Sequence, residues 1–308
     1  MSLCSRVLLA AWIGFALPSM AGVAPVCAQV WTMSAKEPNF IASFGRVSAG
    51  RQVEFKSVGP ASPGKPIFLL LPGVNRNFSP SDVAPQTLAR EGYGVAIAHF
   101  SAQPESIVTL PRGEKAAFDH HDYTLAEMAS EIEAVAMRLK RNHPGSEIIP
   151  VSLSYSGAVS RHIQGFSIAV DVVPMTSSAA ARPELESYRQ SLKAAEAWNP
   201  VLGPSITRSL LDTSYRQHWT GVVESVLRQS RYPSERRSEM LSGYIAMSRA
   251  SEGFVWSPEQ AQQAPRRVFV LASGESKSLL KHQIETFFDV KKNRPDSLLF
   301  VVAESGHI

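Results

Sequence analysis

Apolar residues in this chain fall into short continuous runs that alternate with helical patterns. Runs at 66–73, 93–100 and 147–153 each indicate a strand buried on both faces of a parallel sheet. A helical stretch lies at 82–91, and residues 124–139 begin with a Thr-x-x-Glu capping box and carry apolar side chains at steps of three and four. This alternation is typical of βαβ crossovers, so we predict an α/β fold with a mostly parallel central sheet flanked by helices.

The pattern resumes toward the carboxyl terminus after one interruption. Strands are expected near 166–175, at 266–273 and in the last apolar run, with a helix between the last two. Residues 176–264 contain no strand-like run. Two helical stripes occur there instead, made of Trp219, Val222, Val223, Val226 and Leu227, and of Met240, Leu241, Tyr244 and Ile245. We therefore predict a helical cap at 176–264, inserted into a core of residues 29–175 and 265–308 that starts with a hairpin at 40–58.

The first 28 residues have the layout of a secretory signal peptide. A short basic segment ends at Arg6, an apolar run follows, and small residues precede a cleavage position after Ala28. We expect residues 1–28 to be removed and the mature protein to be secreted or periplasmic. An uncleaved membrane anchor is the alternative, because the apolar run approaches the length that spans a bilayer. Both cysteines, Cys4 and Cys27, lie in this segment, so we expect neither disulfides nor cysteine-ligated metal in the mature chain.

Composition argues against a nucleic-acid-binding protein. The formal net charge is +4, and the basic residues are interspersed with Asp and Glu, which indicates a solvated surface. A hydrophobic fraction of 44% is enough for the core of one large α/β domain. The segment His120-His121-Asp122 resembles a metal cluster, but adjacent side chains point in different directions and a capped helix follows directly. We expect a solvated turn there, with no metal and no cofactor.

The segment 147–157, EIIPVSLSYSG, predicts a strand that ends at a serine, turns sharply and enters a helix. Such a turn pushes the serine hydroxyl away from its backbone and leaves room only for small neighbours. Ser152 and Ser156 lie two residues before and after Ser154, and Gly157 lets the helix pack close to the sheet. Ser154 is therefore the candidate nucleophile. The alternative is an ordinary loop serine, because small residues flank a serine by chance in many chains.

The order of the predicted elements resembles the α/β-hydrolase superfamily, from the hairpin and the 66–73 strand to the last strand, with a helical cap between the sixth and seventh strands. The resemblance covers nearly all of the mature chain and rests on the pattern of elements more than on specific motifs. It implies a nucleophile after the fifth strand, an acid after the seventh and a histidine after the eighth. Ser154 and His307 match the first and the last of these places.

His307 is also favoured by its surroundings. It follows Gly306 at the end of an apolar strand, on the carboxyl edge of the sheet, where ligands collect in open α/β folds. Imidazole can take the proton of a serine hydroxyl near neutral pH and then pass it to the leaving group. A disordered penultimate residue is the alternative interpretation.

The third member of the triad is less clearly indicated. In the family the acid usually stands three residues after a glycine, and the residue at that distance from Gly274 is Lys277. Glu275 lies in the same loop, and we expect it to orient the imidazole and stabilise its protonated form. Asp171 and Glu184, near the sixth strand, are the alternatives, and Glu275 would then be a solvated surface residue.

The resemblance further implies an oxyanion hole made of two backbone N–H groups. Tyr155, after the nucleophile, supplies one, and Val74 supplies the other after a Pro-Gly pair that replaces the family's His-Gly. Pro150 lies inside the central strand, where its missing N–H costs a ladder hydrogen bond unless a bulge or a strand end accommodates it. The chain stops one residue after His307 without the helix that usually packs beside the last strand, so we expect either a truncated chain or an exposed flank.

These features favour an exported serine hydrolase that cleaves a carboxylic ester through an acyl-enzyme on Ser154, and the same machinery would cleave an amide. The expected partner is a small-molecule ester or amide, with no nucleic acid and no stable membrane insertion after cleavage of the leader. The alternative is an α/β-hydrolase fold without catalysis that serves for binding, because the acid matches poorly. A cofactor-free perhydrolase or haloperoxidase would use the same three groups.

Overall fold

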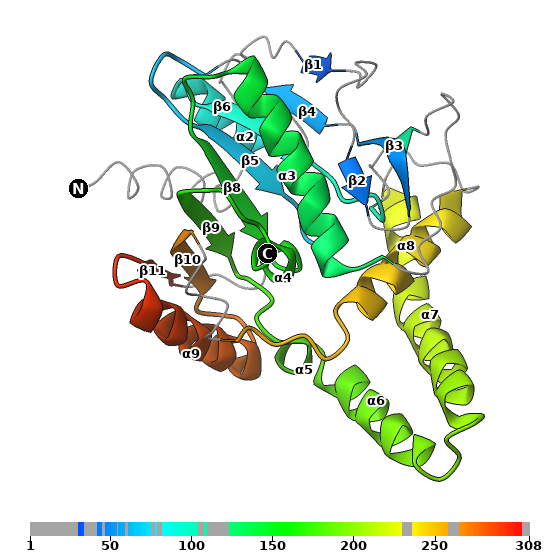
Figure 1. Cartoon of the computed structure of the whole chain (residues 1–308). Coiled ribbons are helices and arrows are strands. Elements are labelled where there is room, and N and C mark those ends of the chain that lie inside the picture. The colour runs from blue at the N-terminus through cyan, green and yellow to red at the C-terminus, as the bar shows by residue number, and fades with distance from the viewer. Residues whose placement is uncertain are drawn as a thin grey trace.

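The computed structural model describes residues 30–33, 42–44, 47–53, 55–58, 61–74, 78, 82–103, 108–109, 123–229, 236–257 and 265–303. Eight strands form the main sheet (Figure 1). Their order across it is β1 (Val30–Met33), β4 (Phe55–Val58), β6 (Gly94–Ala98), β5 (Ile67–Leu71), β8 (Ile148–Leu153), β9 (Ile168–Val172), β10 (Arg266–Ala272) and β11 (Leu298–Val302). The pairs from β6 to β11 are parallel, and β1–β4 and β4–β6 are antiparallel. The predicted α/β class with a mostly parallel sheet is confirmed.

The amino-terminal strands differ in part from the predicted hairpin at 40–58. Strands β2 (Ala42–Phe44) and β3 (Val47–Val53) do form an antiparallel pair, which β7 (Val108–Thr109) extends into a small second sheet. Strand β4, however, leaves this hairpin and pairs with β6 in the main sheet. A single short sequence pattern does not reveal which partner a strand will choose, since pairing depends on what lies beside it in space.

Helices cover both faces of the main sheet. The alternation of side chains along β5 sends Leu69 and Leu71 into one apolar cluster and Phe68 and Leu70 into the other. The first cluster also takes side chains from α3 (Leu125–Asn142), α4 (Ser156–Ser160) and α9 (Lys277–Asn293). The second takes Leu88 from α2 (Val83–Arg90). Both faces of the central strands are therefore buried, as their continuous apolar runs predict.

Helix α3 begins with the predicted capping box. The Thr124 hydroxyl accepts from the N–H of Glu127 at 3.2 Å, and the Glu127 carboxylate accepts from the N–H of Thr124 at 2.7 Å. The five apolar side chains predicted for its inner face are all buried, namely Leu125, Met128, Ile132, Val135 and Leu139. In Figure 1 this helix lies across the strands β5 and β8.

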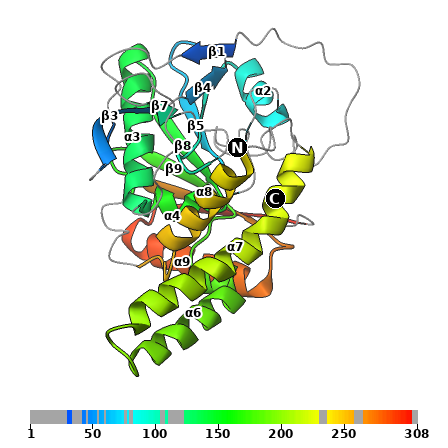
Figure 2. The ribbon, with the colours of Figure 1, turned by 90° about the vertical axis from the view of Figure 1, so that its right-hand side faces the viewer.

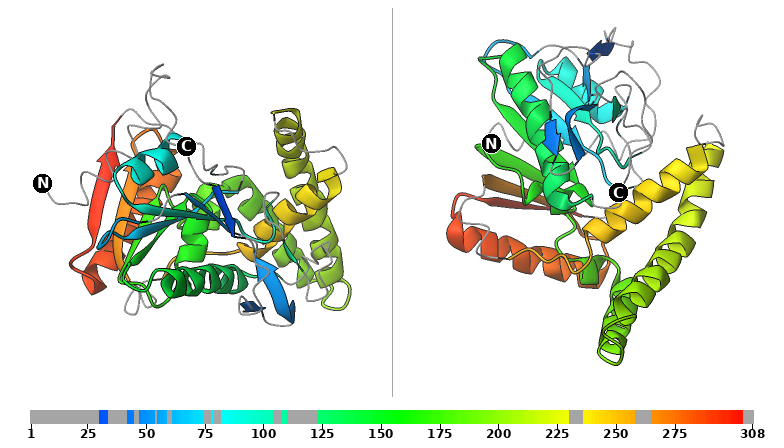
Figure 3. Two further views of the ribbon diagram at one scale, coloured as in Figure 1. Left: turned by 90° about the horizontal axis from the view of Figure 1, so that it is seen from above. Right: turned by 45° about the vertical axis from the view of Figure 1, so that its right-hand side comes forward.

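The described residues between β9 and β10 include the helices α5 (Ser178–Ala181), α6 (Pro183–Glu196), α7 (Gly203–Gln229) and α8 (Arg237–Ala250). The chain enters and leaves this stretch side by side, through an antiparallel bridge between Ser177 and Val255. Helices α6 and α7 form an arm directed away from the sheet, and α8 returns toward it (Figures 2 and 3). The two predicted stripes meet where Trp219 stacks on Tyr244, with ring centroids 5.0 Å apart. That residues 176–264 form a cap separate from the core stays a prediction.

Among the described residues, every helix is too short or too polar to cross a lipid bilayer. Residues 1–29, which contain the predicted signal peptide, lie outside the described residues.

Candidate functional site

Ser154 occupies a sharp turn between strand β8 and helix α4. Its φ angle is 53°, in the left-handed region that costs an L-residue about 1–2 kcal/mol. The turn is held on both sides, because its N–H donates to the oxygen of Val172 at 3.0 Å and its carbonyl accepts from the N–H of Met175 at 2.8 Å. Ser154 itself is half-buried, so its side chain is not sealed in the core. The strand, turn and helix predicted for this segment are thus present.

The small residues around the turn fit for the reason predicted. A Cβ atom at Gly157 would lie 2.5 Å from the Cβ of Pro174 and 2.8 Å from its Cα, so only glycine fits without a shift of backbone. The hydroxyl of Ser156 is buried and accepts from the N–H of Leu153 at 2.7 Å. It also lies 2.8 Å from the carbonyl oxygen of Leu71 on the neighbouring strand. Helix α4 can therefore start directly at the end of the sheet.

Asp171, one of the alternative acids, is committed to a buried ion pair instead. Its carboxylate and the guanidinium of Arg267 are both fully buried and lie 3.1 Å apart. The carboxylate also accepts from Ser152 at 2.5 Å and from Ser160 at 2.6 Å. These bonds join β8, α4, β9 and β10 behind the turn. Asp171 is the penultimate residue of β9, and its fully buried carboxylate is bonded to Arg267, Ser152 and Ser160. This structural role behind the serine turn argues against the alternative of Asp171 as the triad acid.

Pro150 is accommodated near a strand end, which is one of the two possibilities that the sequence analysis named. It pairs in register with Leu69 of β5, whereas the ladder between β8 and β9 begins only at Val151. The missing N–H of Pro150 therefore falls before the start of that second ladder, and the central strand is not interrupted.

Glu275 lies in the loop after the carboxyl end of β10. Strand β9 pairs in parallel with both β10 and β8, so these three strands run in the same direction. Glu275 and Ser154 thus follow strand ends at the same edge of the sheet. The Glu275 side chain is half-buried and accepts from the N–H of Ser276 at 2.8 Å. The other alternative acid, Glu184, is exposed on the first turn of α6.

His307 lies outside the described residues, so its position relative to Ser154 stays a prediction. The strand that precedes it, β11, is parallel to β10 and ends at Val302 on the same edge. The cluster His120-His121-Asp122 is likewise outside them, and within the described residues no three potential metal ligands are grouped together.

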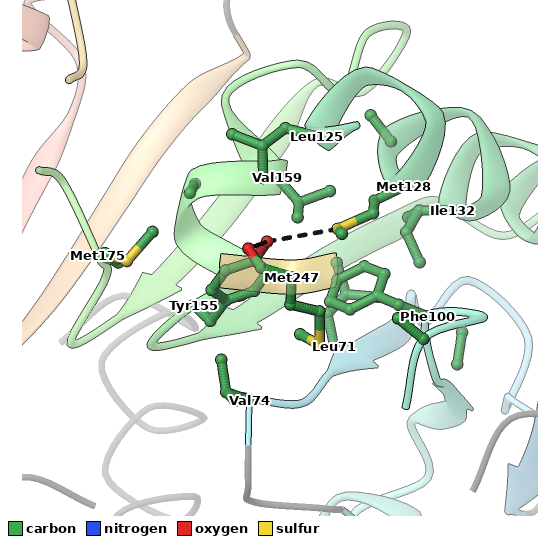
Figure 4. Packing of buried hydrophobic residues seen from close by; sticks show 14 of the residues in the cluster. Leu71, Val74, Phe100, Leu125, Met128, Ile132, Tyr155, Val159, Met175 and Met247 are labelled. Carbon is green, nitrogen blue, oxygen red and sulfur yellow. Dashed lines mark hydrogen bonds between the residues drawn. The ribbon is translucent and has the colours of Figure 1, made fainter. Parts of the chain in front are cut away.

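The two expected oxyanion donors lie on neighbouring elements. Val74 follows β5, Tyr155 follows β8, and these strands pair in parallel. Both residues are buried in the same cluster, where Figure 4 shows them near Leu71. Within the described part of the chain, neither backbone N–H donates to an acceptor. Two donors are thus available at the edge where the strands end.

The Tyr155 side chain has a separate, structural task. Its hydroxyl lies 3.8 Å from the sulfur of Met128 (Figure 4) and donates to the carbonyl oxygen of Met247 in α8 at 2.7 Å. Burial raises the pKa of this hydroxyl well above its usual range, so it stays neutral.

One buried polar residue at this edge escaped the sequence analysis. The side-chain amide of Gln103, which follows β6, donates to the carbonyl oxygen of Gly73 at 2.6 Å. A polar residue three positions after the apolar run 93–100 is a signal that could have found it, since side chains at strand ends gather at one edge of a parallel sheet.

Comparison with solved structures finds many chains of similar fold, among them the following three. A carboxylesterase from Nitrososphaera gargenis shares 12% identity with a TM-score of 0.52, over 86% of this chain and 90% of its own. An esterase from Pyrococcus furiosus shares 13% with a TM-score of 0.51, over 94% and 88%. An α/β hydrolase from a Medee basin deep-sea metagenome shares 11% with a TM-score of 0.50, over 86% and 90%.

No protein-family model matches the chain, and no curated protein matches its sequence. At these identities the structural likeness concerns the fold. It agrees with the sheet order described above, with the serine turn after the fifth strand of the main sheet and the helical stretch between the sixth and seventh. The chain therefore has the fold of the α/β-hydrolase superfamily.

Proposed function

We propose that this protein is an exported serine hydrolase that cleaves a carboxylic ester. The observation that carries the proposal is the left-handed backbone of Ser154, at the end of the central strand and at the start of a helix. Backbone strain of this kind persists only where the surrounding structure over-determines it, and it gathers at functional sites. The bonds from Val172 and Met175 supply that constraint here.

In the proposed reaction, the Ser154 hydroxyl attacks the ester carbonyl carbon while His307 takes its proton. The carbonyl oxygen becomes an oxyanion, which the N–H groups of Tyr155 and Val74 stabilise. His307 then gives the proton to the departing alcohol, and an acyl-enzyme remains on Ser154. Water attacks this ester with His307 as base, which releases the acid and restores the serine. Glu275 orients the imidazole and stabilises its protonated form.

The ester, rather than the amide, is chosen because two of the similar structures are esterases by name. The export step rests on residues 1–28 alone. Mass spectrometry of the protein recovered from a secreting host should give a chain that starts at Gln29. An intact leader on protein held in the membrane fraction would favour an anchor.

A fluorophosphonate probe tests the chemistry directly, because it forms a covalent bond only with an activated serine. Folded protein should be labelled at one serine, with peptide mapping to Ser154. The variant Ser154→Ala should lose both the adduct and the turnover of p-nitrophenyl acetate. Ser209→Ala is the matched control, because Ser209 is an exposed serine on helix α7 and we expect its loss to leave the adduct and the turnover unchanged. Absence of an adduct on folded wild-type protein would contradict the proposal and favour a catalytically inactive binding protein.

A further inference from the structure

Gln103 uses both ends of its side-chain amide within the buried edge of the sheet. It is 2% exposed. Its Oε1 accepts from the N–H of Phe100 at 2.8 Å, and its Nε2 donates to the carbonyl oxygen of Gly73 at 2.6 Å. Its own N–H closes the loop by donating to the oxygen of Phe100 at 2.8 Å. Since the amide faces one donor and one acceptor, only one of its two orientations satisfies both.

The bond to Gly73 sets the direction of the next N–H. The Gly73–Val74 peptide is planar and trans, so its carbonyl oxygen and the N–H of Val74 point in opposite directions. A donor that fixes the oxygen of Gly73 therefore fixes where the Val74 N–H points. It also polarises the same amide, which makes that N–H a stronger donor.

The loop that carries Gln103 is itself anchored to α3. The Glu131 carboxylate, which is fully buried, accepts from the N–H of Ser101 at 2.9 Å and from the hydroxyl of Tyr123 at 2.7 Å. It also accepts from the hydroxyl of Ser101. These three hydrogen bonds hold the loop rigidly against α3, because breaking any one of them would leave the buried carboxylate without a compensating donor, at a cost in free energy.

Helix α8 packs against the other side of the loop that carries Gln103. A Cβ atom at Gly243 would lie 2.0 Å from the carbonyl oxygen of Ala102, so the helix and the loop are in backbone contact. Four residues later in the helix, the oxygen of Met247 accepts from the Tyr155 hydroxyl. One helix thus supports both the loop behind Val74 and the residue that supplies the second donor.

We propose that Gln103 is a positioning residue for the oxyanion hole, which it serves by orienting the Gly73–Val74 peptide. The inference rests on the proposed hydrolase function. Gln103 touches no substrate. It acts through Val74, whose N–H gains most when negative charge develops on the substrate oxygen, so its loss should lower kcat and leave KM nearly unchanged.

Two variants test this. Gln103→Met keeps the size of the side chain and removes both hydrogen bonds. Gln103→Leu also removes both hydrogen bonds, with a branched apolar side chain in place of the amide. Both should lower kcat for p-nitrophenyl acetate by about 10- to 100-fold with KM within about threefold, since one oxyanion donor contributes about 10²–10³-fold in kcat. The ³¹P resonance of the fluorophosphonate adduct should shift in parallel, because its phosphoryl oxygen occupies the same hole.

Leu88→Ala is the control for lost stability, since Leu88 is buried in the cluster on the opposite face of the sheet. It should lower the Tm and leave kcat and the ³¹P shift unchanged. A wild-type protein without a Ser154 adduct overturns the proposed function and the role of Gln103 with it. A labelled wild type with unchanged kcat in both Gln103 variants overturns the role of Gln103 alone. A fall in kcat that Leu88→Ala reproduces at equal Tm overturns it as well.

Discussion

The backbone N–H of Met175 donates to the carbonyl oxygen of Ser154 across 2.8 Å, so the segment after β9 holds the serine turn in place. That segment is strained as well, because Val173, a β-branched residue, has a φ angle of 44°. Val173 is fully buried and donates its N–H to the oxygen of Val270 at 2.8 Å. Two left-handed residues thus lie on neighbouring strand ends at the edge of the candidate site, and backbone hydrogen bonds to Val172 and Met175, on either side of Val173, hold the serine turn.

Relieving the backbone strain at Ser154 should raise stability without restoring activity. Ser154→Gly and Ser154→Ala both remove the hydroxyl, but only glycine adopts a φ of 53° without steric cost. We expect the glycine variant to have a free energy of unfolding about 1 kcal/mol above that of the alanine variant, with no activity in either. Urea denaturation of the two proteins measures the difference. Equal stability, or a more stable alanine variant, would show that the turn is unstrained.

Helix α4 packs closely on the segment after β9, so adding one methyl group at Gly157 should lower both stability and ester turnover. Gly157→Ala places a Cβ 2.5 Å from the side chain and 2.8 Å from the backbone of Pro174, so the turn must move. We expect the free energy of unfolding to fall by about 1–3 kcal/mol and ester turnover to fall at least tenfold.

Gly221→Ala is the matched control for that substitution. Gly221 lies inside helix α7, and a Cβ there meets nothing within 4 Å. The same chemical change should therefore stabilise the protein by about 0.5–1 kcal/mol, through higher helix propensity, and leave turnover unchanged. If Gly157→Ala behaves like Gly221→Ala in both measurements, the close contact does not constrain the site.

Much of this edge could be predicted because it depends on local sequence. Continuous apolar runs reveal strands buried on both faces, and the Thr-x-x-Glu box at Thr124 reveals where α3 begins. The serine turn follows from small residues at set distances, because the steric limits of a turn act within a few residues. Ser154 was identified on that basis.

The remainder depends on contacts between distant segments. Asp171 looked like an available acid because its partner Arg267 lies 96 residues along the chain. Gln103 was missed because its contact with Gly73 spans 30 residues, and no local pattern marks a side chain that orients a peptide on a neighbouring strand. Strand β4 was assigned to a hairpin because its partner β6 becomes adjacent only after a crossover.

The ion pair between Asp171 and Arg267 should be costly to break from one side. Arg267→Met leaves a fully buried carboxylate without its cation, and we expect a loss of about 3–5 kcal/mol in the free energy of unfolding. The double variant Arg267→Met, Asp171→Leu removes both charges and should recover part of that loss. As a surface control, Lys292→Ala removes an exposed partner of Asp289 and should cost under about 1 kcal/mol. Chemical denaturation of the three variants measures these differences; a small effect of Arg267→Met would contradict the buried charge.

Buried His99 should make the protein less stable in mild acid. Burial, with a smaller contribution from the charge of Lys56, lowers the pKa of His99 to about 3. An unfolded histidine titrates near 6.5, so below that pH the unfolded chain binds a proton that the native state refuses. Stability from this group is therefore complete above about pH 6.5 and falls as the pH drops toward 3, by about 1.4 kcal/mol per pH unit.

His99→Leu tests this directly, because it removes the titrating group and keeps an apolar side chain at the end of β6. Between pH 7.5 and 5.5, wild-type protein should lose about 1.4 kcal/mol more of its unfolding free energy than the variant, measured by urea denaturation at each pH. Burial also lowers the pKa values of His162, His218 and His282, so the variant should keep a shallower slope of the same sign. Identical slopes in the two proteins would mean that His99 is solvated or paired when protonated, and that the end of β6 is open to water.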